Sequence, residues 1–82
     1  MHKILIADDS LTIQKVIKIT LANEAFELSE CLSDEELDSS LLEEKPNIVL
    51  LDFNLSEDKT GYELAEDIMD KLPGAKILML FG

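Results

Sequence analysis

Asn47-Ile48-Val49-Leu50-Leu51-Asp52 predicts the central strand of the molecule, because an unbroken apolar run here ends on a carboxylate. Pro46 precedes the run and a polar loop follows it. A continuous apolar run with these boundaries is typical of a strand buried on both faces, as in a parallel sheet. Open α/β sheets bind their ligands at the carboxyl ends of the strands. Asp52 is therefore the first candidate functional residue.

Two further short apolar runs predict strands over residues 3–7 and 76–81, and a loose alternation predicts a half-exposed edge strand over residues 26–32. Helical spacing of apolar residues fills the three intervals between the strands. The expected inward-facing residues are Ile13, Val16, Ile17 and Leu21 in the first helix, Leu37, Leu41 and Leu42 in the second, and Tyr62, Ala65, Ile68, Met69 and Leu72 in the third. Strands that alternate with helices predict an α/β fold with right-handed crossovers and a parallel sheet.

Local signals place the ends of these helices. Ser10 is the expected N-cap of the first helix, which should end near Asn23 and turn Gln14 toward solvent. Ser33 and Glu36 have the spacing of a capping box before the second helix. Short connections throughout predict one small domain over residues 1–82.

Composition narrows the possible partners. The 82 residues are 46% apolar and 30% charged, with a formal net charge of −11. This excess of acid argues against binding to nucleic acid or to anionic membranes, and it favours cations or a basic protein surface. Cys31 is the single cysteine, so it cannot form an intrachain disulfide. The chain also lacks an apolar stretch of about 18 residues, the length of a membrane span, and we expect a cytoplasmic protein.

Asp8 and Asp9 follow the first predicted strand, as Asp52 ends the third. If these strands are neighbours, their carboxylates meet at one edge of the sheet. Two carboxylates about 4 Å apart repel by about 4 kcal/mol at an effective dielectric near 20. A hard divalent cation such as Mg²⁺ or Mn²⁺ would remove this conflict. The alternative is that Asp8 and Asp9 cap the first helix and that Asp52 lies among solvated acids.

Three stretches together, residues 3–10, 48–52 and 61–64, resemble a response-regulator receiver domain, and the resemblance extends over the whole chain. It implies a flavodoxin-like, doubly wound sheet, with strand order 2-1-3-4 in this chain. It also implies two-component or phosphorelay signalling, with Asp52 accepting a phosphoryl group from a histidine kinase or phosphotransfer protein. Asp8, Asp9 and Asp52 would bind Mg²⁺ with the backbone carbonyl of Asn54. Such a domain catalyses only its own phosphorylation and turns over no independent substrate.

The chain departs from the receiver pattern at its C-terminal end. Phe81 occupies the switch position, where Thr or Ser is expected. The fourth helix, fifth strand and fifth helix of a receiver are missing, and with them the catalytic lysine. Lys3 and Lys76 are expected at the wrong edge of the sheet, away from the acids. Lys59 and Lys15 are expected nearer the acids, but neither replaces the missing lysine. We therefore expect an incomplete receiver domain.

The missing segment would leave the fourth strand as an exposed apolar edge, and such edges recruit another strand. One expected way to cover this edge is a homodimer in which the fourth strands of two copies pair. A second functional hypothesis follows, in which the chain is a degenerate or truncated receiver that acts as a protein-interaction module without phosphorylation. A third hypothesis, a flavodoxin-like hydrolase that depends on a cation, ranks last because the sequence offers no general base or substrate pocket.

Overall fold

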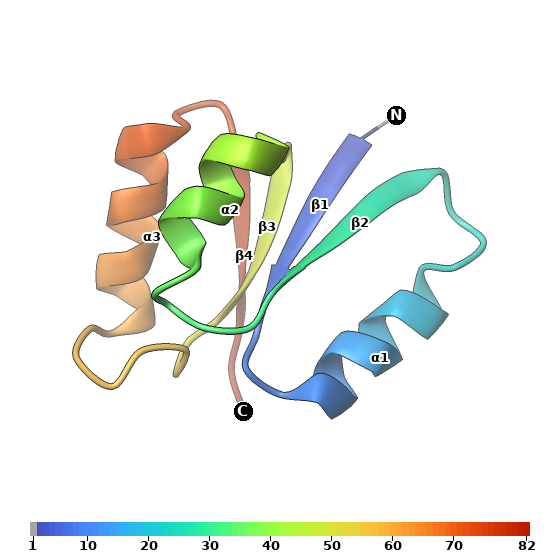
Figure 1. Cartoon of the computed structure of the whole chain (residues 1–82), viewed down its shortest axis with the longest axis horizontal. Helices are drawn as coiled ribbons and strands as arrows, with labels where there is room; N and C mark the ends of the chain where they lie inside the picture. Colours follow the sequence, from blue (N-terminus) through green and yellow to red (C-terminus); the bar gives the residue numbers. More distant parts are fainter. Residues whose placement is uncertain (1) are drawn as a thin grey trace.

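The computed structural model describes residues 2–82 and contains one sheet of four parallel strands (Figure 1). The strands are β1 (His2–Ala7), β2 (Phe26–Cys31), β3 (Ile48–Asp52) and β4 (Lys76–Leu80). Their order across the sheet is β2-β1-β3-β4, with β2 and β4 at the edges. The predicted α/β fold and its strand order are confirmed. The second and fourth strands each end one residue earlier than the sequence patterns suggested.

Three helices connect the strands: α1 (Leu11–Thr20), α2 (Leu37–Glu44) and α3 (Gly61–Lys71). The chain moves one way across the sheet from β1 to β2, then reverses to reach β3 and β4. Right-handed crossovers therefore place α1 on one face and the other two helices on the opposite face. Figure 1 shows α2 beside α3, with α1 well apart from both. None of the helices within residues 2–82 is long and apolar enough to cross a membrane.

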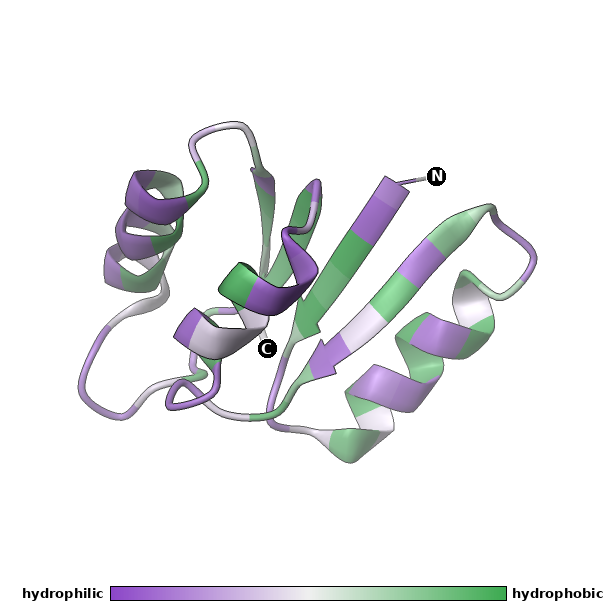
Figure 2. Cartoon of the chain, turned by 45° about the horizontal axis from the view of Figure 1, so that its top comes forward, coloured by the Kyte–Doolittle hydropathy of each residue, from purple (hydrophilic) through white to green (hydrophobic). Residues whose placement is uncertain are grey.

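The main core lies between the sheet and the two helices α2 and α3. Hydrophobic residues run along the middle of β1 (green in Figure 2). The buried members of this core are Leu5, Ala7, Cys31, Leu37, Leu41, Val49, Leu51, Leu55, Leu64 and Ile68. The thiol of Cys31 is part of this core, and burial raises its pKa. Within residues 2–82, α1 is the only helix on the opposite face of the sheet.

The expected solvent-facing position of Gln14 is wrong, because this residue is buried. In its place, Ile13 and Val16 of the predicted inward face are largely exposed. Gln14 turns toward the sheet because its amide donates hydrogen bonds to backbone carbonyls at the strand ends. Ile13 and Val16 instead border an open hollow beside the end of β4. The helix also ends earlier than expected, at Thr20 rather than near Asn23.

The faces of α2 and α3 differ from the sequence expectation at three residues. Leu42, Tyr62 and Met69 were expected in the core but are exposed, Leu42 with 66% of its surface. Leu64, which lies outside the predicted inward stripe, is buried together with Ile68. In both helices the apolar residues form a wider stripe than the part that packs on the sheet, so spacing alone does not identify which of them face inward.

The side-chain caps at the helix N-termini agree only in part with the prediction. Ser10 caps α1 as predicted. The capping box predicted at Ser33 and Glu36 is wrong, because α2 begins at Leu37 and Glu36 itself is the N-cap without a side-chain bond. Ser33 Oγ instead lies 3.2 Å from a carboxylate oxygen of Glu36. The capping box that forms belongs to α3 and joins Thr60 and Glu63.

Gly61, the first residue of α3, packs directly against the segment that follows Asp52. A Cβ atom at Gly61 would lie 2.8 Å from the Cα atom of Phe53 and 2.6 Å from its ring. We expect Gly61→Ala to lower the free energy of unfolding by about 1–3 kcal/mol, because the backbone at Phe53 must move. Urea denaturation followed by circular dichroism measures this change.

Gly74 provides the matched control, since a Cβ atom there would meet nothing within 4 Å. Gly74→Ala should change stability by no more than about 0.5 kcal/mol. Equal stability of the two variants would contradict the predicted close contact at Gly61.

Candidate cation-binding site

Three carboxylates meet at the carboxyl edge of the sheet. Asp8 and Asp9 follow β1 directly, and Asp52 is the last residue of β3. The two strands are paired neighbours, with Ala7 opposite Leu51. Each of the three acids offers a carboxylate oxygen, and these atoms all lie within 4.8 Å of one another. The predicted convergence is confirmed.

Backbone N–H groups orient two of these carboxylates. The amide of Ser10 donates to Asp8 Oδ1 over 2.8 Å, and the amide of Asn54 donates to Asp52 Oδ1 over 3.0 Å. The amide of Asp8 itself donates to the carbonyl of Cys31 at the end of β2, over 3.0 Å. Asp8 is buried, Asp52 is half-buried and Asp9 is exposed. Backbone hydrogen bonds therefore hold the cluster in place, and its Asp9 side is open to solvent.

The electrostatics of the cluster are unfavourable without a counter-charge. Burial raises the pKa of Asp52, and the negative charges of Asp8 and Asp9 raise it further, although the Asn54 amide opposes the shift. A bound cation would reverse this balance, because it favours the ionised form of every carboxylate that it contacts.

The residues present fit a small divalent cation. All three side chains supply carboxylate oxygens, which are the ligands that Mg²⁺ and Mn²⁺ prefer in proteins. Mg²⁺ commonly binds through one or two carboxylates and keeps several waters, so the open side of the cluster suits it. Asn54 lies next to the cluster through its bond to Asp52. Its carbonyl as a further ligand stays a prediction.

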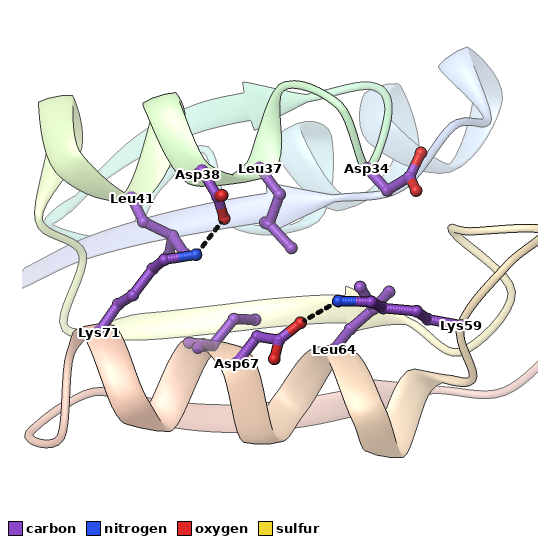
Figure 3. Close-up of a pocket in the computed structure, with 9 residues that line it drawn as sticks. Asp34, Leu37, Asp38, Leu41, Lys59, Leu64, Asp67 and Lys71 are labelled. Carbon is purple, nitrogen blue, oxygen red and sulfur yellow. Dashed lines mark hydrogen bonds and ion pairs between the residues drawn. The ribbon is translucent and has the colours of Figure 1, made fainter.

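The lysines considered from the sequence lie away from this cluster. Lys59 Nζ is 2.8 Å from a carboxylate oxygen of Asp67. Figure 3 shows this pair on the α3 side of a pocket of about 250 Å³ between α2 and α3, together with a second pair, Lys71 with Asp38, that joins the two helices. Lys59 is therefore engaged on the α3 side and not with Asp52.

Lys3 and Lys76 lie at the edge of the sheet away from the acids, as predicted. Lys76 lies opposite Ile48, at the amino end of the sheet, and Lys3 lies near the start of β1. Lys15 is exposed and lines a hollow over α1 with Lys18 and Glu30. Among residues 2–82, no lysine lines the two hollows that border the three acids.

Phe81 lies beside the acids, at the position predicted for the switch residue. It follows β4, and with Asp8 and Asp52 it lines a hollow that also includes apolar residues of α1. Its ring centroid is 5.1 Å from that of Phe53, which in turn contacts Tyr62 edge-on. The side chain is 67% exposed and has no hydroxyl to offer an anion. The structure thus has an aromatic ring at the position where the hydroxyl group of Thr or Ser was expected.

The family model of the response regulator receiver domain matches residues 4–81, nearly the whole chain. The chain belongs to the response regulator receiver domain family. Receiver domains of this family are those of two-component signalling systems. The match agrees with the strand order and with the position of the acids at the carboxyl edge.

Solved receiver structures are similar to this one over its full length. A CheY-like receiver protein from Methanospirillum hungatei JF-1 is 30% identical with a TM-score of 0.89, and the match covers 100% of this chain and 65% of that one. The response regulator DrrB from Thermotoga maritima is 28% identical with a TM-score of 0.84, and the match covers 99% of this chain and 36% of that one. A receiver domain protein from Clostridium thermocellum is 25% identical with a TM-score of 0.87, over 100% and 66%. This receiver domain thus spans about two thirds or less of these relatives.

Sequence reasoning missed one residue at the site. Gln14 lies under the acids and contacts the backbone of Asp8. The available signal was a polar residue inside an apolar helical pattern, and such a residue usually faces solvent. Only the position of α1 over the ends of β1 and β2 reveals its contacts.

Proposed function

We propose that Asp52 of this receiver domain accepts a phosphoryl group from a histidine kinase or a phosphotransfer protein. Asp8, Asp9, Asp52 and the backbone carbonyl of Asn54 would bind the Mg²⁺ or Mn²⁺ that the transfer requires. The observation that supports the proposal is the meeting of three carboxylates within 4.8 Å at the carboxyl edge of the sheet. The domain would work in the cytoplasm, without binding nucleic acid or membrane.

The proposed step is a displacement at phosphorus. An oxygen of Asp52 attacks the phosphorus atom of a phosphohistidine, and the phosphorus–nitrogen bond breaks. The electron pair stays on the imidazole nitrogen, which then takes up a proton. The Asn54 amide holds the Asp52 carboxylate in a fixed orientation, and such positioning is a major part of phosphoryl-transfer catalysis. When bound, the divalent cation supplies positive charge that offsets the phosphoryl and carboxylate oxygens.

A relative adds support. The receiver domain of DrrB has been solved in a BeF3-activated form, and it is 28% identical to this chain with a TM-score of 0.83. That match covers 99% of this chain and 66% of the DrrB receiver. We extend activation of the receiver domain from that protein to this one, with a phosphoryl group on Asp52 as the activating group. In this proposal the domain promotes only its own phosphorylation and is no independent enzyme.

Intact-mass spectrometry after incubation with Mg²⁺ and a small-molecule phosphodonor tests the proposal. We expect one phosphoryl group on the wild type and none on Asp52→Asn, because the variant lacks the nucleophilic oxygen. Asp58→Asn is the matched control, since Asp58 is an exposed acid in the loop after β3, and it should be phosphorylated like the wild type. An unmodified wild type that circular dichroism shows to be folded would contradict the proposal.

A second candidate function is an interaction module that works without phosphorylation. Two observations favour it: Phe81 offers no hydroxyl beside the acids, and β4 is an edge strand whose Leu78 is 57% exposed. An unprotected apolar edge favours pairing with another strand, and the proposed pair is a homodimer through β4. Sedimentation of the unphosphorylated protein distinguishes the candidates, because a stable dimer that is unchanged by the phosphodonor would favour the interaction module.

A further inference from the structure

Gln14 is a polar side chain that is buried at the carboxyl ends of β1 and β2, with 1% of its surface exposed. Its Nε2 atom lies 2.7 Å from the carbonyl oxygen of Ile6, 3.0 Å from that of Asp8 and 3.3 Å from that of Cys31. Carbonyl oxygens only accept hydrogen bonds, so the nitrogen of the amide must face them. The two N–H bonds of one side chain of α1 are thus shared among three backbone carbonyls.

These three points surround the start of the acidic loop. Ile6 lies in β1, Cys31 ends β2, and Asp8 is the first residue after β1. The amide of Asp8 also donates to the carbonyl of Cys31. Gln14 and Asp8 therefore share an acceptor, and together they join the end of β2 to the loop that carries two of the three carboxylates.

The other end of the Gln14 amide is consistent with this role. Its Oε1 atom is buried, and no partner for it is found among the described residues. Leaving a buried polar atom without a hydrogen bond is unfavourable. An apolar side chain of the same length would avoid that cost. The donor end of the amide therefore accounts for the presence of a glutamine at this position.

We propose that Gln14 is a positioning residue for the cation site. Its side-chain amide fixes the backbone of Asp8 and, through it, the carboxylates of Asp8 and Asp9 relative to Asp52. The inference rests on the proposed function, since it assumes that these carboxylates bind Mg²⁺. Groups that orient metal ligands through hydrogen bonds typically affect metal affinity by about 10–100-fold when they are replaced.

Calorimetric titration with Mg²⁺ tests the proposal on the full chain. Gln14→Met keeps the length of the side chain and removes its donor, and we expect the dissociation constant for Mg²⁺ to rise about tenfold. Ile68→Val is the matched control, because Ile68 is fully buried in the core on the α2 and α3 side. It should lower the melting temperature without changing the affinity of the folded protein for Mg²⁺. All titrations are run at a temperature at which circular dichroism shows each protein to be folded.

A second measurement needs no variant and covers the case in which Gln14→Met does not fold. Gln14 is the single glutamine of the chain, so its side-chain NH₂ resonances can be assigned in an amide NMR spectrum. During a Mg²⁺ titration of the wild type, these resonances should shift with the same midpoint as the backbone amide of Asp52. Resonances that do not move would overturn the proposal.

The outcomes separate the two levels of inference. A wild type that does not bind Mg²⁺ would overturn the proposed cation site and the role of Gln14 with it. A wild type that binds Mg²⁺ while Gln14→Met binds equally well would overturn only the role of Gln14. Equal weakening by Gln14→Met and Ile68→Val would likewise overturn it, because the effect would then reflect stability rather than position.

Discussion

Leu51→Ala is expected to remove a large part of the stability of this domain. Leu51 is completely buried in β3, where it pairs with Ala7 on one side and Met79 on the other. Removing a buried leucine side chain lowers the free energy of unfolding by about 2–5 kcal/mol, depending on how far the site collapses. Small domains bury a small fraction of their surface and have only about 5–15 kcal/mol in total. Urea denaturation should show a large fall of the midpoint.

Leu42→Ala makes the same chemical change on the surface of α2. Because Leu42 is exposed, this variant should change stability by no more than about 0.5 kcal/mol. Comparable losses in the two variants would mean that Leu42 packs in the core, as its spacing in the sequence suggested. That result would contradict the arrangement of α2 described above.

Saturating Mg²⁺ is expected to stabilise the folded protein strongly. A ligand present at about 100 times its dissociation constant adds about 2.7 kcal/mol. For a domain of this size the melting temperature should rise by about 10–20 °C. Asp52→Asn should lose most of this response, because it removes one of the three carboxylates. Differential scanning calorimetry with and without Mg²⁺ measures both effects, and Asp58→Asn should respond like the wild type.

The same variant should be more stable than the wild type when no cation is present. The pKa of Asp52 is raised by burial and by the charges of Asp8 and Asp9, so ionisation of Asp52 disfavours the folded state. The stability of the cation-free wild type should therefore fall as the pH rises through this pKa. At neutral pH we expect Asp52→Asn to melt about 4–8 °C higher, for a relieved repulsion of about 1 kcal/mol.

The advantage of Asp52→Asn should shrink as the pH falls toward the ordinary pKa of an aspartate, about 3.9. Below that value Asp52 is protonated in both the folded and the unfolded state, so the variant and the wild type then carry the same charge at this position. An advantage that grew with acidification would show that Asp52 is stabilised in its ionised form, contrary to the electrostatics of the cluster.

Much of the site was predictable because its signals are local. Apolar runs that end at Asp8 and Asp52 identify two strands with acids at their carboxyl ends, and the alternation of strands and helices requires these strands to be parallel. The pairing of β1 with β3 then brings the acids together. The similarity to receiver domains agrees with this arrangement over residues 4–81.

The partners of Lys59 and of Phe81, the residue at the switch position, could be identified only from the structure. Lys59 lies near Asp52 in the sequence, but its ammonium group pairs with Asp67 across the loop. Phe81 was expected at the end of a strand, and the structure shows it beside Phe53 at the rim of the acidic site. Each outcome depends on which partner comes within reach after folding, and short-range sequence patterns carry no such information.

The sequence by itself determined the type and order of the elements and the acids at the carboxyl ends of β1 and β3, because run length and periodicity act within a few neighbouring residues. Only the tertiary structure decided which side of α1 faces the sheet. The apolar pattern favoured Ile13 and Val16, but the buried carbonyls at the strand ends required a donor, and Gln14 provides it. That requirement arises only when β1, β2 and α1 have come together, since in the separate segments the same carbonyls are hydrated.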